Sequence, residues 1–355
     1  MKVVVKDFLN VRVGKPSVNA PCYQYIAPGS EIEVDGVLYD GDFYDHNNRW
    51  MKDAAGNYYW SGGIQSLPVS PSISLEEFKE SDFWWLADFN IEKLWNEGLS
   101  GRGIRIAVLD SGLSLPHPDL VLESGNQKDL SESGSITDQT GHGTHVTGII
   151  KASNNGLGIK GIAFNSEFYF AKITNDNIGD SVEYLISGME WAIEKNVDII
   201  SISNGLASGD PSLKKSIEKA AGKNILIVCA AGNKTESTGN DILYPAKYTH
   251  VLSIGGLTRT KDPLPDTINA HQTNLFAPGE NILSTHLNKS YKPLSGSSQA
   301  TPFVAGVAAL LLEAKRKLDK SCKGIMLKER LLISADKKSL VRIVNPLEAL
   351  KLIST

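Results

Sequence analysis

The stretch RIAVLDSG, residues 105–112, places an apolar run of strand length directly before an aspartate and a small-residue turn. Three further runs of the same kind follow along the chain, at residues 168–173, 198–203 and 225–231. Helical patterns separate these runs, and in one of them, residues 182–193, apolar side chains recur on one helix face. Strands buried on both faces and separated by helices predict an α/β fold with a doubly wound, mostly parallel sheet.

The residues before this predicted sheet have a different sequence pattern. Residues 1–66 hold short alternating runs broken by Pro-Gly, Asp-Gly and Gly-Asn pairs, which are typical of strands and hairpins. Residues 67–82 contain prolines and serines without periodicity and predict a linker. We therefore expect a small all-β domain at 1–66, a linker at 67–82 and the α/β domain at 83–355.

Composition excludes several classes of partner. The 355 residues carry a net charge of -4, which gives no polycationic surface, so we expect no nucleic acid partner. No apolar stretch approaches the roughly 20 residues of a membrane span. The first residues lack the apolar segment of a secretory signal, so we expect a cytoplasmic protein, or a secreted or periplasmic one if the chain has been trimmed. Cys22, Cys229 and Cys322 are scattered and are expected to be free thiols.

Polar residues stand where sites gather in such sheets, at strand ends and helix starts. Asp110 ends the first run, His142 lies between two glycines at an expected helix start, Asn233 follows the fourth run, and Ser298 precedes an apolar helix. Each residue alone has an ordinary interpretation, because Asp and Asn cap turns and a single His is more often structural than catalytic. His145, three residues into the same helix, is expected to lie in the core.

The four residues together are the set that nucleophilic acyl transfer requires. A serine is unreactive at neutral pH unless a base takes its proton, and the base needs a carboxylate that holds its tautomer. The tetrahedral intermediate needs preorganised donors, which an asparagine amide and the free N–H groups of a helix N-terminus supply. An aspartate, a histidine, an asparagine and a serine in these positions therefore predict hydrolytic chemistry.

Four segments, IAVLDSG, GHGTHVTGI, AAGN and GSSQATPFVAG, resemble those of the subtilisin family and follow one another in its order. The resemblance covers the chain from about residue 83 onward. It implies that Ser298 is the nucleophile, His142 the general base, Asp110 its orienting carboxylate, and Asn233 an oxyanion donor together with the Ser298 N–H. Gln299 departs from the pattern, since the family usually has Met after the nucleophile.

Residues 1–66 resemble bacterial SH3-like domains in the order of their motifs. In such a small all-β barrel Leu9 to Arg12 would open the fold and Trp50 would pack inside it. The aromatic side chains Tyr39, Tyr44, Tyr58 and Tyr59 would either bind a partner, such as a peptide or a cell-wall fragment, or fill the core of the barrel.

The resemblance also implies where substrate would bind. A strand end that pairs with the substrate backbone is matched by Ser203, Asn204 and Gly205, and Asn204 would make the S4 subsite more polar than usual. The walls of the S1 subsite would come from Ala230, Ala231 and Gly232, with Leu243 near its base. Leu243 stands where a smaller residue is common, which predicts a shallow apolar S1.

A structural calcium ion is implied by the same resemblance, although none is required for the chemistry. Asp119 in PHPDL would be its carboxylate ligand, and Asn155 in the loop ASNNGLGIKGIA a side-chain ligand. The alternative is a glycine-rich turn without metal, because only one carboxylate is visible in these two segments.

The sequence thus predicts a serine endopeptidase that hydrolyses peptide bonds of protein or peptide substrates through an Asp-His-Ser triad and an acyl-enzyme. The alternative is a catalytically lapsed or highly selective scaffold of the same fold, whose SH3-like domain binds a partner. The intact set Asp110, His142, Asn233 and Ser298 favours the enzyme.

Overall fold

The computed structural model describes residues 2–6, 9–35, 37–44, 47–64, 78–123, 125–177, 179–234 and 239–354. The chain divides into two compact units, residues 1–72 and 73–355. Most of the predicted linker, residues 67–77, lies outside the described residues. Residues 78–82, expected to belong to the linker, instead join the larger unit, because the ring of Phe78 packs edge-on against the rings of Phe83 and Tyr291.

The smaller unit is built of antiparallel strands, as the turn-forming residue pairs in its sequence predict. Its strands are β1 (Lys2–Val4), β2 (Leu9–Val13), β3 (Cys22–Ile26), β4 (Glu31–Glu33), β5 (Tyr39–Tyr44), β6 (Asn47–Lys52) and β7 (Asn57–Trp60), followed by the 3-10 turn η1 (Ser61–Gly63). Five of them form a sheet in the order β3-β2-β7-β6-β5, and β1 pairs with β4. Val11, Met51 and Tyr59 are among the side chains of its buried cluster.

A nine-stranded sheet lies at the centre of the larger unit, in the order β19-β20-β16-β15-β14-β13-β8-β10-β9. Its strands are β8 (Arg105–Asp110), β9 (Gln127–Asp129), β10 (Glu167–Lys172), β13 (Ile199–Ile202), β14 (Leu226–Ala230), β15 (Val251–Leu257), β16 (Leu275–Pro278), β19 (Asp336–Lys338) and β20 (Val341–Ile343). All pairings are parallel except that of β19 with β20. The four runs predicted from the sequence agree with β8, β10, β13 and β14 to within one residue at each end.

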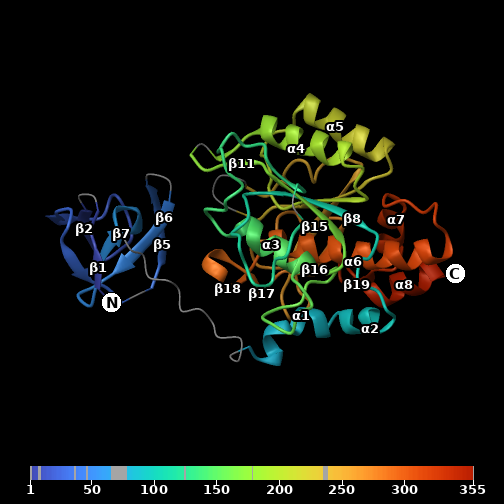
Figure 1. The fold of residues 1–355 in the computed structure, drawn as a ribbon, viewed down its shortest axis with the longest axis horizontal. Helices are drawn as coiled ribbons and strands as arrows, with labels where there is room; N and C mark the ends of the chain where they lie inside the picture. The colour runs from blue at the N-terminus through green and yellow to red at the C-terminus, as the bar shows by residue number, and fades with distance from the viewer. Residues whose placement is uncertain are drawn as a thin grey trace. The chain divides into compact units, whose positions relative to one another are not determined.

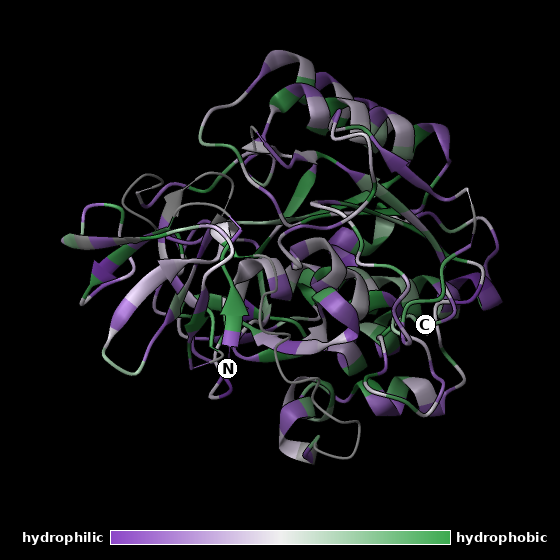
Figure 2. Ribbon diagram, turned by 60° about the vertical axis from the view of Figure 1, so that its left-hand side comes forward, coloured by the Kyte–Doolittle hydropathy of each residue, from purple (hydrophilic) through white to green (hydrophobic). Residues whose placement is uncertain are grey.

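Helices cover both faces of this sheet because its strands are apolar on both faces. Along β8, Ile106 and Val108 join one buried cluster, while Ala107 and Leu109 join another on the opposite face. The first cluster includes side chains of α3 (His142–Lys151) and α6 (Ser297–Leu318), and the second those of α4 (Val182–Glu194) and α5 (Pro211–Gly222). Figure 1 shows α4 and α5 on one side of the strands and α3 and α6 on the other, and Figure 2 shows the hydrophobic strands between them.

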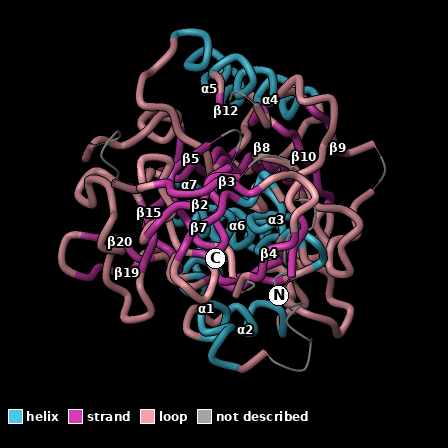
Figure 3. The backbone as a smooth tube through the Cα atoms, turned by 90° about the vertical axis from the view of Figure 1, so that its left-hand side faces the viewer, coloured by secondary structure: helices cyan, strands magenta, loops and turns pink. Residues whose placement is uncertain are grey.

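Shorter elements complete the larger unit, and two of them, the helices α1 and α2, are labelled at the bottom of Figure 3. The helices are η3 (Glu80–Phe83), α1 (Trp84–Ala87), α2 (Ile91–Asn96), η4 (Leu287–Lys289), α7 (Met326–Ile333) and α8 (Pro346–Ser354). Two hairpins are β11 (Thr174–Asn175) with β12 (Gly179–Asp180), and β17 (Ile282–Thr285) with β18 (Tyr291–Leu294). None of the helices in the described ranges combines the length and the apolar character that a bilayer crossing requires.

The order of the strands determines at which edge of the sheet the candidate site lies. The first strand of the sheet in sequence, β8, lies between β10 and β13, so the chain runs outward from β8 in both directions. A crevice opens at the carboxyl ends of the strands at such a point of reversal. Asp110 ends β8, and Ser203 directly follows β13, so both residues lie at this edge.

Candidate active site

Asp110 is a fully buried carboxylate at the end of β8. Its Oδ1 accepts hydrogen bonds from the Ser111 N–H at 2.8 Å and from Nδ1 of His142 at 2.7 Å. A carboxylate in a low-dielectric interior is costly unless donors or an opposite charge compensate it. These two donors hold its orientation toward the imidazole.

His142 is the first residue of α3, and its tautomer follows from its partner. An ionised carboxylate can only accept a hydrogen bond, so in the neutral imidazole Nδ1 carries the proton and Nε2 presents a lone pair. The helix begins after Gly141, whose φ of 83° is in the left-handed region and where a Cβ would come within 2.3 Å of His286 Nε2. Glycine at this position therefore lets the chain place His142 at the edge of the sheet.

The pKa of His142 lies above its ordinary value of 6.5. Burial alone would lower the pKa, but the negative charge and hydrogen bond of Asp110 outweigh burial, and the charges of Asp138 and Asp180 add to the effect. The neutral imidazole is the form that takes a proton from a hydroxyl. Because the pKa is raised, this form predominates only at more alkaline pH than for an isolated histidine.

Asp138 is a second buried carboxylate beside His142, and the sequence analysis missed it. Its Oδ1 accepts from the Ser111 hydroxyl at 3.0 Å and the Gly141 N–H at 2.9 Å, and its Oδ2 from the Thr144 N–H at 2.9 Å. These bonds tie the turn after β8 to the first turn of α3. An Asp four residues before His142 was the available signal, because carboxylates are favoured at helix N-termini.

Ser298 is the second residue of α6, and the end of β13 holds it in place. Its Oγ donates to the carbonyl of Ser203 at 3.1 Å, and the Ser203 hydroxyl donates to the carbonyl of Ser298 at 2.9 Å. In the register of β13 with β8, Ile202 pairs with Leu109, so Ser203 is level with Asp110. Neighbouring strands are about 4.8 Å apart, so Ser298 is anchored one strand away from the carboxylate that holds His142.

No hydrogen bond joins Ser298 Oγ to His142 in the described part of the chain, because the hydroxyl donates to Ser203 instead. Rotation about the χ1 angle of Ser298 redirects the hydroxyl without moving the backbone. Catalytic hydrogen bonds are often long or misaligned without substrate and tighten in the complex.

Asn233 lies three residues beyond β14 and is oriented by the start of α6. Its Oδ1 accepts the N–H of Ser297 at 3.1 Å, which identifies Nδ2 as the donor group of this amide. A Cβ on Gly296 would come within 2.8 Å of that Nδ2, so the backbone before Ser298 passes close to the amide. The N–H of Ser298 is in the first turn of α6, where a helix offers no internal acceptor.

The candidate S1 residues lie together after β14 and β13. Gly232 has a φ of 102°, and a Cβ there would come within 2.7 Å of the Leu243 side chain. A Cβ on Gly205 would meet the same leucine at 2.8 Å. Leu243 is held by its N–H bond to Ala231 at 3.0 Å, while Ala230 is buried at the end of β14. The leucine therefore occupies the space between the two glycine-bearing segments.

Two further predictions concern histidine and cysteine. His145 is fully buried, and its Nε2 lies 3.0 Å from the carbonyl of Ile282 and 2.9 Å from that of Lys292. Burial lowers its pKa to about 3, so it is a neutral core residue, as predicted. The cysteines Cys22, Cys229 and Cys322 are free, and the first is only partly buried.

Asp119 and Asn155, the expected calcium ligands, lie in neighbouring loops. Asp119 is fully buried; its Oδ2 accepts from the Ile159 N–H and the Tyr291 hydroxyl, both at 2.8 Å, while its Oδ1 is buried without a hydrogen-bond partner. Asn155 donates to the Pro118 carbonyl at 3.1 Å, and its Oδ1 accepts the Leu157 N–H at 2.9 Å. The unpaired oxygen of Asp119 fits a cation, whereas Asn155 braces its own loop.

Comparison with known proteins gives one consistent result for the larger unit. Residues 101–345 match the model of the Subtilase family. The minor extracellular protease Epr of Bacillus subtilis (strain 168) is 38% identical over 228 residues, which are 64% of this chain and 35% of that protein. The chain thus spans about a third of that relative's length.

Two more relatives from the same organism are similar over a larger share of their own length. Subtilisin E is 32% identical over 257 residues, covering 70% of this chain and 68% of its own. The major intracellular serine protease is 38% identical over 228 residues, covering 62% of this chain and 71% of its own. The chain belongs to the subtilase family of serine endopeptidases.

Proposed function

We propose that the protein hydrolyses internal peptide bonds of proteins or peptides with Ser298 as nucleophile. The observation that carries the proposal is the 2.7 Å hydrogen bond between His142 Nδ1 and the buried Asp110 carboxylate. It leaves Nε2 as a base of raised pKa at the edge of the sheet where Ser298 is anchored. A lapsed scaffold would have no need of this buried pair, whose desolvation is costly.

Each group has one part in the reaction. The Ser298 hydroxyl turns from the Ser203 carbonyl and gives its proton to Nε2 of His142 as Oγ bonds to the substrate carbonyl carbon. The carbonyl π electrons move to oxygen, and this oxyanion accepts hydrogen bonds from Nδ2 of Asn233 and the N–H of Ser298. His142 then protonates the leaving amine as the C–N bond breaks, and water releases the acyl group by the reverse sequence.

A peptide blocked at both ends, by acetylation and amidation, tests this function directly. An endopeptidase cleaves such a peptide at an internal bond, and mass spectrometry of the two fragments identifies the bond. If the folded protein leaves a mixture of blocked peptides intact across the alkaline pH range, the proposed function is wrong.

We extend the proposal to a small residue at P1, the position before the scissile bond, because Leu243 fills the space between Gly205 and Gly232. Replacement of Leu243 by glycine is expected to raise kcat/KM for a Phe P1 substrate by at least about tenfold, since pocket contacts of one or more methylenes change discrimination by about 10 to 200-fold. The measurement is kcat/KM for matched P1 Ala and Phe peptides.

The P1 Ala peptide is the internal reference for this variant, and Leu243→Ile, which conserves volume, is the control that should keep the wild-type preference. If the wild-type enzyme already prefers Phe at P1, or if the glycine variant gains nothing on it, the shallow S1 subsite is excluded.

A structural calcium ion is part of the same proposal. Asp119 would hold it through the buried Oδ1 that lacks a partner. The described residues contain no cluster of three or more His, Cys, Asp and Glu, so most ligands would be carbonyl oxygens of the loop after α3. The ion would stabilise this loop and leave the acyl-transfer chemistry to the protein's own groups.

Removal of calcium is then expected to destabilise the larger unit. An ion at about 100 times its Kd contributes about 2.7 kcal/mol, so EDTA should lower Tm by about 5 °C or more in a domain of this size. Calcium, and not magnesium, should restore Tm after the chelator is removed. A Tm that neither treatment moves would favour the metal-free turn.

We also propose that residues 1–66 form an SH3-like barrel that binds a peptide or a cell-wall fragment. The five-stranded antiparallel sheet and the buried Trp50 support this fold. Tyr59 is buried in the core, whereas Tyr39 and Tyr58 stack edge to face with Lys52 over both rings, which makes them the candidate contact residues. The test measures how the Ser298→Ala protein binds cell-wall fragments, with and without the further replacement Tyr58→Ala. Binding that this replacement leaves unchanged would exclude the surface formed by Tyr39 and Tyr58.

A further inference from the structure

A small hollow lies beside the strand end that holds Ser298. It has a volume of about 10 Å³ and is lined by Ile173, Asp180, Ser181, Leu185, Asn204, Gly205 and Leu206. Such a volume holds about one water molecule. The hollow is thus too small for a bulky apolar side chain. Ile173, Leu185 and Leu206 make part of its lining apolar, and its polar groups belong to Asp180, Ser181 and Asn204.

Asp180 is the charged group on this rim, and its neighbours fix one of its two oxygens. Oδ1 accepts the hydroxyl of Thr174 at 2.6 Å and the side-chain Nδ2 of Asn204 at 3.1 Å. Thr174 is also its cross-strand partner in the β11–β12 hairpin. Asp180 is exposed, and in the described ranges no lysine or arginine forms an ion pair with it. Its Oδ2 is therefore available to a donor.

Asn204 presents a second acceptor at the same place. A carboxylate cannot donate, so the amide nitrogen must face Asp180, and this fixes the orientation of the side chain. Its Oδ1 is then a buried oxygen without a hydrogen-bond partner. A buried acceptor left unsatisfied costs about 1–3 kcal/mol, which an arriving donor would recover.

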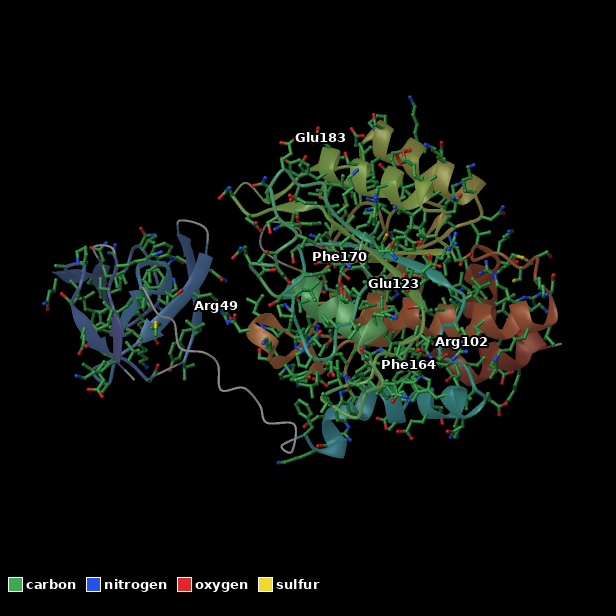
Figure 4. All side chains as sticks on the ribbon, in the orientation of Figure 1. Arg49, Arg102, Glu123, Phe164, Phe170 and Glu183 are labelled. Atoms are coloured by element: carbon green, nitrogen blue, oxygen red, sulfur yellow. The ribbon has the colours of Figure 1, made fainter. Side chains whose placement is uncertain are left out.

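The charges around the hollow leave it negative. Lys172 ends β10 directly before Ile173, which lines the hollow, and its charge is neutralised by both oxygens of Asp176. Glu183, which Figure 4 labels at the start of α4, is exposed and accepts a hydrogen bond from the Ser181 hydroxyl. A cationic side chain would meet an attractive potential, whereas an acidic one would be repelled.

The distance from the reacting serine sets the substrate position that reaches the hollow. Ser203 contacts Ser298, and Asn204 is the next residue of the strand end along which substrate would extend. Three residues of extended chain span about 10 Å. When P1 lies opposite Ser203, the fourth residue before the scissile bond, P4, therefore lies opposite Leu206, which lines the hollow.

We propose that this hollow selects a basic P4 side chain, arginine above lysine, and that the protein cleaves substrates with a basic residue three positions before P1. The inference rests on the proposed endopeptidase function. The planar guanidinium can donate to Asp180 Oδ2 and Asn204 Oδ1 together, while an ammonium is a compact point charge. The hollow is too small to take the whole arginine or lysine side chain. The long aliphatic stem nevertheless lets the charged end reach the polar groups at the rim of the hollow.

The test measures kcat/KM on four blocked peptides that differ only at P4, which is Arg, Lys, norleucine or Glu. We expect Arg to exceed norleucine by about tenfold, the equivalent of about 1.4 kcal/mol, with Lys between them and Glu lowest. Asp180→Asn should reduce the ratio of the Arg rate to the norleucine rate to about twofold or less. The two rates are compared within each variant, so that a change in the pKa of His142 affects both peptides alike and cancels in the ratio. Raising the salt concentration should weaken the wild-type preference, since the rim is exposed.

Asp88→Asn is the matched control, because it removes the charge of one exposed aspartate directly after α1, away from this edge of the sheet. It should keep the full Arg preference. A flat P4 profile in the wild type would overturn the proposal. So would an Asp180→Asn variant that keeps the wild-type ratio of the Arg rate to the norleucine rate, since Asp180 would then act only through the pKa of His142. If the wild type cleaves none of the peptides, the proposed function itself fails.

Discussion

Replacement of Ser298 by alanine is expected to abolish peptide hydrolysis, with kcat lowered by about 10⁶-fold, the magnitude known for loss of the nucleophile in subtilisin. The serine Oγ is the only atom in the proposed mechanism that bonds to the substrate carbon. What remains after its removal is the modest catalysis of the oxyanion donors and binding groups. The expected loss is therefore close to the whole enzymatic rate.

The measurement is the rate of cleavage of a blocked peptide, with thermal unfolding as a check on folding. Ser295→Ala is the matched control, because Ser295 is an exposed serine three residues away whose Oγ accepts the Asn281 N–H at 2.8 Å. This variant should retain activity within about twofold. If the Ser298→Ala variant retains more than about a thousandth of the wild-type activity, another group is the nucleophile.

Replacement of Asn233 by alanine is expected to lower kcat by about 10² to 10³-fold with little change in KM. The amide Nδ2 is oriented by the bond between Asn233 Oδ1 and the Ser297 N–H, so it is ready to donate before charge develops on the substrate oxygen. Such an interaction strengthens only in the transition state, which is why kcat falls and KM does not.

A merely structural role for Asn233 would give a different result. Loss of the bond to Ser297 costs about 1 kcal/mol of stability, which would lower Tm but would not slow a folded enzyme a hundredfold. Measurement of kcat, KM and Tm on the same preparation separates the two effects. A variant with normal kcat and reduced Tm would remove Asn233 from the oxyanion site.

The sequence predicted the features that depend on local pattern. Residues 105–110 form a strand because six residues of this composition, followed by a turn, favour a buried strand, and the parallel sheet follows from the helices between such runs. The positions of Asp110 and His142 could be predicted in the same way, since one ends β8 and the other begins α3.

Other features depend on contacts between distant segments, which no local pattern reports. Leu243 meets Gly205 and Gly232 only because β13 and β14 are neighbours in the sheet. The sequence does not distinguish Asp138 from other acidic loop residues. Its hydrogen bonds to Gly141 and Thr144 form only when the loop packs against α3. The start of the larger unit was placed too late because the ring packing of Phe78 is likewise a tertiary contact.

The central claim is that Ser298 is a serine activated by His142 and Asp110. A fluorophosphonate probe reacts covalently with such a serine and not with an ordinary hydroxyl, so the most direct measurement is the mass of the labelled protein followed by mapping of the modified peptide. The account predicts one adduct per chain, on Ser298, that is absent from the Ser298→Ala variant. A folded protein that takes up no probe, or takes it up at another residue, would contradict it.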